Sequence, residues 1–315
     1  MKTIEWGFLI VNYLFLGGLS AGLFFISALA VYLGGRDDVT YARIARWGAL
    51  LAPWPVAAGS ALLIFDLGNW NRFYLLFAHF KWHSPMSIGS WLLLVFNGVA
   101  FVYLWSWLPA ARRAWIVAKL RLPASLDRDL SGSRRLIAAA GFPLSVAVAI
   151  YTGVLLGAVQ ARPFWNTNLV AQMFLFSAIS TACALLIVVL SWGKSRPDPT
   201  ELRVLYTLDI CLMTLEFFVV LPYVIHGELS AQAVRDSLDL ILGGPFTVAF
   251  WVLFVGGGLL APLALEVWEI APALLKSAPM HFNRGITILA CAMVIGGGYL
   301  LRYVFVYAGQ ASAFR

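Results

Sequence analysis

The sequence is poor in charged residues. Of its 315 residues only 12% are Asp, Glu, Lys or Arg, whereas 61% are hydrophobic. A soluble domain typically carries about 25% charged and about 45–50% apolar residues. This composition excludes a soluble enzyme, a disordered chain and a nucleic-acid-binding protein. It indicates a polytopic membrane protein, in which the net charge of +7 reports topology before it reports a ligand.

The sequence also has few residues that bind redox metals. Its three cysteines lie far apart inside apolar runs and no Cys-x-x-Cys occurs, which excludes a thiolate-bound cluster held by this chain alone. The four histidines fall in loops or at the ends of apolar runs, whereas a di-haem membrane anchor needs paired imidazoles on facing helices. We therefore expect no haem or metal cluster on this chain, and an electron carrier that is organic or held by another chain.

What the sequence has instead is a series of long apolar runs. A hydrocarbon core about 30 Å thick is crossed by roughly 20 helical residues, and a helix leaves no backbone group unpaired in lipid. Eight runs are long enough, at approximately residues 6–33, 47–66, 88–108, 136–159, 168–192, 204–226, 246–268 and 285–307. The prediction is an all-α, multi-pass protein of a bacterial or archaeal cytoplasmic (inner) membrane, with residues 1–315 forming one membrane domain.

The distribution of Lys and Arg predicts the orientation of these spans. The connections after spans one, three, five and seven hold 15 of the 22 basic residues. By the positive-inside rule these connections are cytoplasmic, so that both termini lie outside. The residues are Arg36, Arg43, Arg46, Arg112, Arg113, Lys119, Arg121, Arg128, Arg134, Arg135, Lys194, Arg196, Arg203, Lys276 and Arg284.

Three connections are more than turns. Residues 109–135 mix basic with apolar side chains, as an interfacial helix does. Residues 231–242 have an amphipathic pattern, and the loop 67–87 is rich in aromatic residues. Surface helices with an aromatic belt at the membrane interface explain these features, and so does a platform for an extrinsic subunit. Composition does not separate the two interpretations.

A set of polar side chains is expected near the outer ends of the spans. Ionisable and amide groups inside a span are costly and are therefore candidates for function. A rise of 1.5 Å per residue places Asn12 and Tyr13 about 10 Å below the outer interface, and Asp66, Tyr151 and Arg302 are expected near that level. Such groups suit a quinone, because its two carbonyl oxygens need donors and its two-electron reduction takes up two protons.

Each of these residues also has a structural interpretation. Asp66 equally fits a helix-end residue paired with Arg72, and tyrosines are common at membrane interfaces. Arg302 equally fits a side chain that snorkels to the outer surface, and Asn12 one that bonds a neighbouring helix. The small residues around Gly18 allow close helix approach or leave room for a flat ring.

A second set, of acids, lies deeper. Asp209 is near the inner end of span six and Glu216 is at mid-depth, and their spacing puts them on nearly the same helical face. Glu266 and Glu269 are placed near the cytoplasmic edge of span seven, where a helix-end role explains them more simply. A row of acids leading toward mid-membrane is typical of a proton pathway. The predicted pathway consists of Asp209, Glu216, Glu266 and Arg302, although Glu216 also fits a neutral structural residue.

Several blocks occur in a recognisable order. They are the Gly-rich stretch Asn12–Gly22, the block Asp66…Arg72…Ser84-Pro-Met-Ser-Ile-Gly-Ser-Trp91, and Tyr151-Thr-Gly153 followed by Pro163-Phe-Trp-Asn166. With these blocks at compatible spacing, most of the chain resembles the NrfD-like family, the membrane subunits of polysulfide reductase and related molybdenum enzymes.

The resemblance implies a quinone site near the outer surface, lined by spans one to four. The quinone-contacting groups of the family fall here on Asn12 or Tyr13 and on Tyr151, its span-two acid falls on Asp66, and a span-six acid falls more loosely on Glu216. Where some relatives carry a span-one histidine, this chain has Tyr13. The resemblance also implies menaquinone or ubiquinone, an iron–sulfur partner subunit that exchanges electrons with it, and a molybdopterin catalytic subunit beyond.

Two other classes of function stay open at this point. A secondary transporter or channel would use Glu216, Asp209 and Arg302 as ligands near mid-membrane, and inverted repeats and broken helices would mark it; neither is evident in the sequence. A purely structural anchor would leave quinone binding to its partner. The favoured interpretation is a quinone-reactive subunit of a respiratory oxidoreductase complex, not an enzyme alone, that binds quinone near the outer face and conducts protons.

Overall fold

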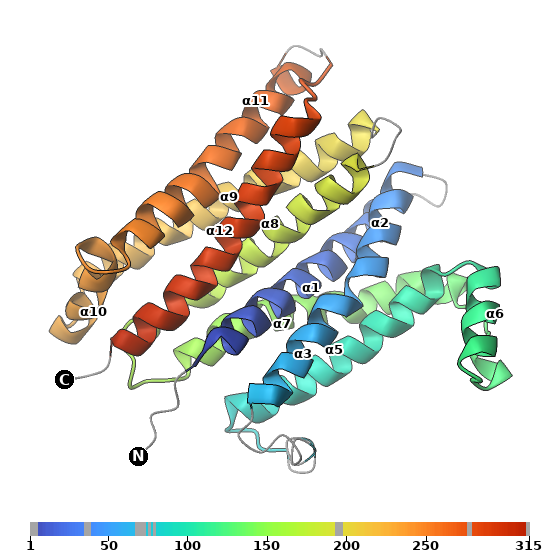
Figure 1. The fold of residues 1–315 in the computed structure, drawn as a ribbon, viewed down its shortest axis with the longest axis horizontal. Helices are drawn as coiled ribbons and strands as arrows, with labels where there is room; N and C mark the ends of the chain where they lie inside the picture. Colours follow the sequence, from blue (N-terminus) through green and yellow to red (C-terminus); the bar gives the residue numbers. More distant parts are fainter. Residues whose placement is uncertain are drawn as a thin grey trace.

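The fold is all-helical in the computed structural model, which describes residues 6–34, 39–66, 74, 77, 80–192, 198–275 and 279–312. Within these residues eight helices are long and apolar enough to cross a membrane, and they coincide with the eight predicted spans. The described part contains helices and turns but no strand. The predicted all-α, multi-pass fold is confirmed (Figure 1).

The N-terminal half forms a first bundle of spans. It consists of α1 (Phe8–Leu33), the consecutive helices α2 (Val39–Leu51) and α3 (Pro53–Asp66), α5 (Pro85–Trp107) and α7 (Arg134–Gly157). α1 packs against α3 and α7, and α5 closes the bundle by packing against the same two helices. Ser84 begins α5 as its N-cap, with Pro85 in the first turn, where a missing N–H costs nothing.

The C-terminal half forms a second bundle. It consists of α8 (Leu169–Ser191), α9 (Pro199–Glu228), the π-helix η4 (Val248–Leu260) continued by α11 (Ala261–Leu275), and α12 (Arg284–Ala311). α8 packs against α9 and α12, and η4 packs against α12. The two bundles meet where α8 and α12 contact α1 (Figure 1). We call this contact the seam.

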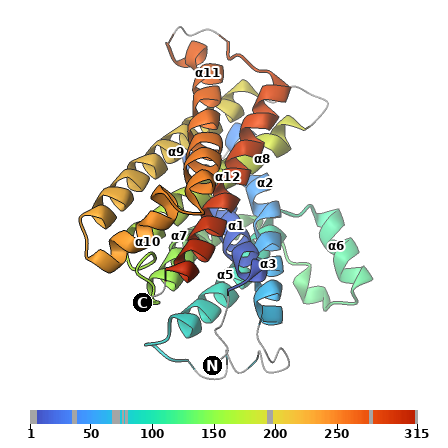
Figure 2. The same ribbon diagram turned by 60° about the vertical axis from the view of Figure 1, so that its left-hand side comes forward.

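Two surface helices confirm the predicted interfacial segments. α6 (Ala110–Lys119) and the 3₁₀ turns η2 (Ala124–Leu126) and η3 (Ser131–Ser133) lie within the loop 109–135, and α10 (Gln232–Leu242) lies within the loop 227–245. Figure 2 shows α6 standing away from the bundles, whereas α10 lies beside α9 and α12. Most of the aromatic loop 67–87 lies outside the described residues.

Two spans are less regular than predicted. The second begins at Val39 instead of near residue 47 and breaks at Ala52, because Pro53 has no N–H to continue the helix. Ser20 of α1 donates a hydrogen bond to the Ala52 carbonyl oxygen at 2.5 Å, and Ala52 is fully buried. The seventh span contains the π-helix and runs on to Leu275. A broken helix is not evident in the sequence, whereas the structure has a break at Ala52, which Ser20 of α1 closes.

The first and last helices end side by side. The Trp6 backbone N–H donates to Gln310 Oε1 at 2.7 Å, and Gln310 Nε2 donates to the Trp6 carbonyl oxygen at 2.8 Å. The start of α1 and the end of α12 therefore lie on one side of the membrane. That this side is the outer one stays a prediction from the Lys and Arg distribution, and we name the two ends of the bundles accordingly.

Candidate functional site

Two buried tyrosines lie near each other toward the outer end of the first bundle. Tyr13 of α1 is 1% exposed and Tyr151 of α7 is 8% exposed, and the two phenols are close enough to interact electrostatically. Tyr151 donates a hydrogen bond to the Pro85 carbonyl oxygen at 3.2 Å. A Cβ at Gly89 of α5 would overlap the phenol ring of Tyr151. The first turns of α5 therefore fix the position of Tyr151.

Asn12 and Gly18, which were also predicted to bind the quinone, do not join this pair. Successive residues of a helix point about 100° apart, so Asn12 and Tyr13 face different neighbours. Asn12 interacts with Tyr299 of α12, and Gly18 faces α8 and α12 as well. Asp66 is the last residue of α3, and its side chain lies outside the described structure. Among the described side chains the tyrosines form one group, and Asn12 and Gly18 face the second bundle.

Arg302 of α12 occupies the seam between the bundles. It is fully buried, and its Nη1 donates to Ser177 Oγ at 2.8 Å and to the Gly298 carbonyl oxygen at 2.6 Å. Its guanidinium lies over the Phe174 ring, 5.1 Å from the centroid. A Cβ at Gly18 would lie 3.1 Å from Nη2, so α1 leaves space for this cation. The interpretation of Arg302 as a snorkelling side chain is wrong.

Glu216 of α9 shares Ser177 with Arg302. Its carboxyl is 3% exposed, bonds the Ser177 side chain and is attracted by Arg302. In the described structure, however, Glu216 and Arg302 form no ion pair within 4.0 Å. Glu216 Oε1 and Arg302 Nε are both buried without a hydrogen-bond partner. Glu216 therefore gains or loses a proton without breaking a direct salt bridge.

The row of acids continues from Glu216 toward the cytoplasmic end. Asp209 of α9 and Glu266 and Glu269 of α11 are all fully buried. Asp209 accepts a hydrogen bond from Ser180 Oγ at 2.5 Å, and its carboxyl faces that of Glu266. The helix-end interpretation of Glu266 and Glu269 is wrong, because α11 continues to Leu275 and both side chains are buried.

Asp209 and Glu266 form a carboxyl pair with no cation of its own. In the described structure, Asp209 Oδ2 and both oxygens of Glu266 find no hydrogen-bond donor, and no ion pair involves either residue. Two adjacent carboxylates cannot both stay charged in a buried site without a cation. We conclude that the pair holds at least one proton.

Glu269 ends the row at the cytoplasmic end. Its Oε2 accepts from the Tyr206 hydroxyl at 2.6 Å, and its Oε1 accepts from Thr287 Oγ1 at 3.0 Å. The Asn283 backbone N–H approaches Oε1 at 3.4 Å. Asn283 is exposed and belongs to the segment that precedes α12. The last buried carboxyl is therefore separated from the surface by one short segment.

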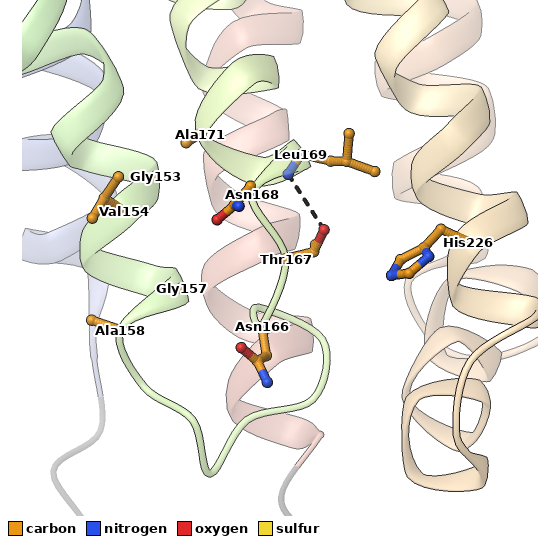
Figure 3. Close-up of a pocket in the computed structure, with 10 residues that line it drawn as sticks. All are labelled: Gly153, Val154, Gly157, Ala158, Asn166, Thr167, Asn168, Leu169, Ala171 and His226. Atoms are coloured by element: carbon orange, nitrogen blue, oxygen red, sulfur yellow. Dashed lines mark hydrogen bonds between the residues drawn. The ribbon is translucent and has the colours of Figure 1, made fainter.

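A groove opens at the outer end of α7, on the side that faces α8. Its volume is about 640 Å³, and it lies between α7, the start of α8 and His226 of α9. Figure 3 shows the Asn166 amide, Thr167 and the His226 imidazole around it. Its lining joins the ends of two sequence blocks, at Gly153 and at Asn166. The turn that carries Asn166 is held in place by Trp165, whose Nε1 donates to the Phe305 carbonyl oxygen at 2.6 Å.

The groups available at this end are hydrogen-bonding groups. Within the described residues no three His, Cys, Asp or Glu side chains are grouped so as to hold a metal ion. The phenols of Tyr13 and Tyr151 are buried, and the groove separately presents the Asn166 amide and the His226 imidazole. Such groups fit a flat organic molecule with carbonyl oxygens.

The comparisons with known proteins agree with the sequence blocks. The chain matches the family described as polysulphide reductase, NrfD, over residues 1–313. The chain belongs to this family. It is 28% identical to Protein NrfD of Escherichia coli (strain K12), covering 98% of this chain and 96% of the relative. It is 29% identical to one of the polysulfide reductase chains of Wolinella succinogenes, covering 98% and 95%.

A further relative carries a different reductase name. It is one of the selenate reductase subunits of Mesobacillus selenatarsenatis, which is 29% identical over 83% of this chain and 66% of the relative. The NrfD resemblance inferred from the sequence is thus confirmed, and membership of this family agrees with a multi-pass membrane protein.

Sequence reasoning missed the neutral members of the acid row in this NrfD-family protein. Ser177, Ser180, Tyr206 and Thr287 each bond a carboxyl of the row. Hydroxyls are common in membrane helices, so none of them is noticeable by itself in the sequence. A periodic signal was present: Tyr206 lies three residues before Asp209, which puts both on one face of α9.

Proposed function

We propose that this chain is the quinone-reactive membrane subunit of an oxidoreductase complex. Family membership, and relatives named as components of polysulfide reductase and selenate reductase, support this proposal. By the same analogy, the partners are an iron–sulfur electron-transfer subunit and a molybdopterin catalytic subunit, and the location is the inner membrane. The outer end, with its groove and α10, is the proposed face for electron exchange.

The proposed quinone site is at the outer end of the first bundle. A bound menaquinone or ubiquinone supplies the redox chemistry, because its reduction takes up two electrons and two protons. Tyr13 and Tyr151 are proposed to donate hydrogen bonds to its ring oxygens and to hold protons at their hydroxyl oxygens. Their burial excludes water, which strengthens such bonds. Asp66, at the end of α3, stays a candidate for proton exchange with the outside.

The observation that carries the proposal is the buried row of acids that leads toward this site. It runs from Glu269 through the Asp209–Glu266 pair to Glu216, and Ser177 joins it to Arg302 at the seam. Arg302 touches Gly18 of α1, which lies about 7.5 Å along the helix axis from Tyr13. We propose that these carboxyls pass protons from the cytoplasm toward the quinone, which would make turnover electrogenic.

The rival classes have less support. A transporter needs a helix break that lines a binding cavity, whereas the break at Ala52 is filled by Ser20. A purely structural anchor has no use for buried carboxyls without cations, because burying them costs free energy.

The quinone site is tested with Tyr13→Phe and Tyr151→Phe. The control is Tyr103→Phe, which changes a fully buried tyrosine near the cytoplasmic end of the same bundle. The purified complex is placed in liposomes, and quinol-linked electron transfer is measured. We expect each site variant to lose about 10²-fold, the scale of a positioned proton donor. Activities equal to that of Tyr103→Phe would disprove the site.

The proton pathway is tested with Glu216→Gln and Asp209→Asn. The matched control is Glu228→Gln, an exposed acid at the outer end of the same helix. We expect proton uptake from the cytoplasmic side to be lost in the two pathway variants and kept in the control. Uptake that is unaffected by Glu216→Gln would remove the pathway and leave the quinone site standing.

A further inference from the structure

A second pocket lies at the cytoplasmic end of the first bundle, away from the tyrosines and the acid row. Its volume is about 300 Å³, and it is lined by the end of α1, the start of α2, the end of α5 and the start of α7. Trp107, Gly132, Arg134 and Arg135 are among its lining residues. A Cβ at Gly132 would meet no atom within 4 Å, so the pocket is open at this point.

Two arginines present unused donors to this pocket. Arg134 Nε donates to the Ser106 carbonyl oxygen at 2.8 Å, and its guanidinium stacks on Trp107 with 4.5 Å to the ring centroid. These contacts hold the guanidinium flat against α5. Among the described residues no acceptor binds the two terminal nitrogens of Arg134 or the guanidinium of Arg135. A planar guanidinium with free paired donors matches the geometry of a phosphate group.

Among the described residues, the arginines around the pocket outnumber the acids. Arg46 and Arg113 both repel Arg134, and Asp129 is the acid that attracts it. Asp129 also pairs with Arg113, at 3.4 Å. Asp127 approaches the same arginine, Arg113, at 3.7 Å. Like charges held together in a partly buried place are costly. A bound anion would remove this repulsion.

The rim of the pocket is apolar and exposed. Leu33 at the end of α1 is 59% exposed, and Leu136 beside Arg135 is 73% exposed. Tyr32, which is 53% exposed, donates its hydroxyl to the Arg135 carbonyl oxygen at 2.7 Å and ties α1 to α7 there. These residues lie at the ends of spans, where acyl chains meet headgroups. Cationic pockets between helices on the cytoplasmic side suit the headgroups of anionic lipids.

We propose that this pocket binds the phosphate of an anionic phospholipid, with Arg134 and Arg135 on the phosphate and the acyl chains along Leu33 and Leu136. The site is independent of the proposed quinone chemistry. It fixes one lipid at the cytoplasmic mouth of the first bundle.

The test measures phosphatidylglycerol bound to the full-length protein with its co-purifying subunits. Native mass spectrometry counts the retained lipid, and titration against phosphatidylcholine gives the relative affinity. The variants are Arg135→Gln, and Gly132→Glu, which places a negative charge beside the open part of the pocket. The control is Arg112→Gln, which makes the same charge change on an exposed residue of α6.

We expect Arg135→Gln to bind phosphatidylglycerol about fivefold more weakly, the effect of about 1 kcal/mol per basic residue near an anionic headgroup. We expect a larger loss for Gly132→Glu and none for Arg112→Gln. Equal binding by all four proteins would overturn the proposal. Displacement of the lipid by millimolar inorganic phosphate would overturn it too, because the pocket would then take free phosphate.

Discussion

Both bundles bury hydroxyls, but among the described side chains only the second bundle also buries carboxyls. Among the side chains that the structure describes, the first bundle buries hydroxyls, such as Ser20, Ser27 and Tyr151, each of which donates to a backbone carbonyl oxygen of a neighbouring helix. Within the described residues, every buried carboxyl lies on the second bundle. These are Glu201, Asp209, Glu216, Glu266 and Glu269.

This difference distinguishes polar groups that join helices from polar groups that need a cation or a proton. A hydroxyl is satisfied by one carbonyl oxygen and joins two helices at little cost. A buried carboxyl needs a cation or a proton, and the Asp209–Glu266 pair has no cation within reach. In the function proposed above, the first bundle holds the quinone ring and the second bundle moves protons. Arg302 and Gly18 lie at one of the contacts between the two bundles.

The largest effect on stability is expected at Arg302. Arg302→Gln removes the charged hydrogen bonds to Ser177 and to the Gly298 carbonyl oxygen. At about 1.5–3 kcal/mol for each such bond, we expect the free energy of unfolding to fall by about 3–5 kcal/mol. The hydroxyl-only control Tyr103→Phe, which loses a 3.1 Å bond with Ser27, is expected to cost about 1 kcal/mol. Equilibrium unfolding of the purified protein in detergent measures both.

The double variant Arg302→Gln/Glu216→Gln sharpens this test. It removes both charges, so part of the lost stability should return. If Arg302→Gln costs no more than Tyr103→Phe, the two bundles do not differ as described.

A smaller effect is expected from filling the seam. Gly18→Val would force its side chain against the Arg302 guanidinium, 3.1 Å from the position of the new Cβ. Overpacking of this kind costs typically about 1–3 kcal/mol. Gly98→Val on α5 is the control, since no atom lies within 4 Å of its Cβ. Equal unfolding free energies for the two variants would mean that the seam is loosely packed.

The carboxyl pair should tolerate neutral replacements. If Asp209 and Glu266 already hold a proton between them, Glu266→Gln keeps the charge nearly unchanged. We expect it to alter the free energy of unfolding by less than about 1 kcal/mol while it abolishes proton uptake. A loss as large as that of Arg302→Gln would show that both carboxyls are charged in the folded protein.

The smallest effect is expected outside the bundles, at the exposed Asp129. Hydrogen bonds from the Ser131 backbone N–H at 3.0 Å and hydroxyl at 2.9 Å lower the pKa of Asp129 below its ordinary value. Its contribution to stability is therefore full at neutral pH and is lost only as pH falls through that lowered pKa. Ser131→Ala should raise the pKa, as carbon-13 NMR of labelled aspartate would show, with electron transfer unchanged.

The span pattern was predictable because it depends on local composition. A run of about 20 apolar residues crosses a membrane whatever its neighbours are, so all eight spans were found. The ends of the spans and their irregularities were harder to predict from the sequence. Glu266 and Glu269 were placed at the edge because the apolar run weakens near residue 268, whereas α11 continues to Leu275 and packs against α9 and α12. The π-helix before it leaves no recognisable mark in the sequence.

By itself the sequence determined the membrane class, the number of spans, the surface helices and, through its ordered blocks, the family. These follow from residues near one another along the sequence. Only the tertiary structure decided that Tyr13 faces Tyr151 while Asn12 faces α12, that Arg302 is buried at the seam, and that Asp209 meets Glu266. Each of these depends on how a helix is rotated against a distant segment, which the sequence of one helix does not contain.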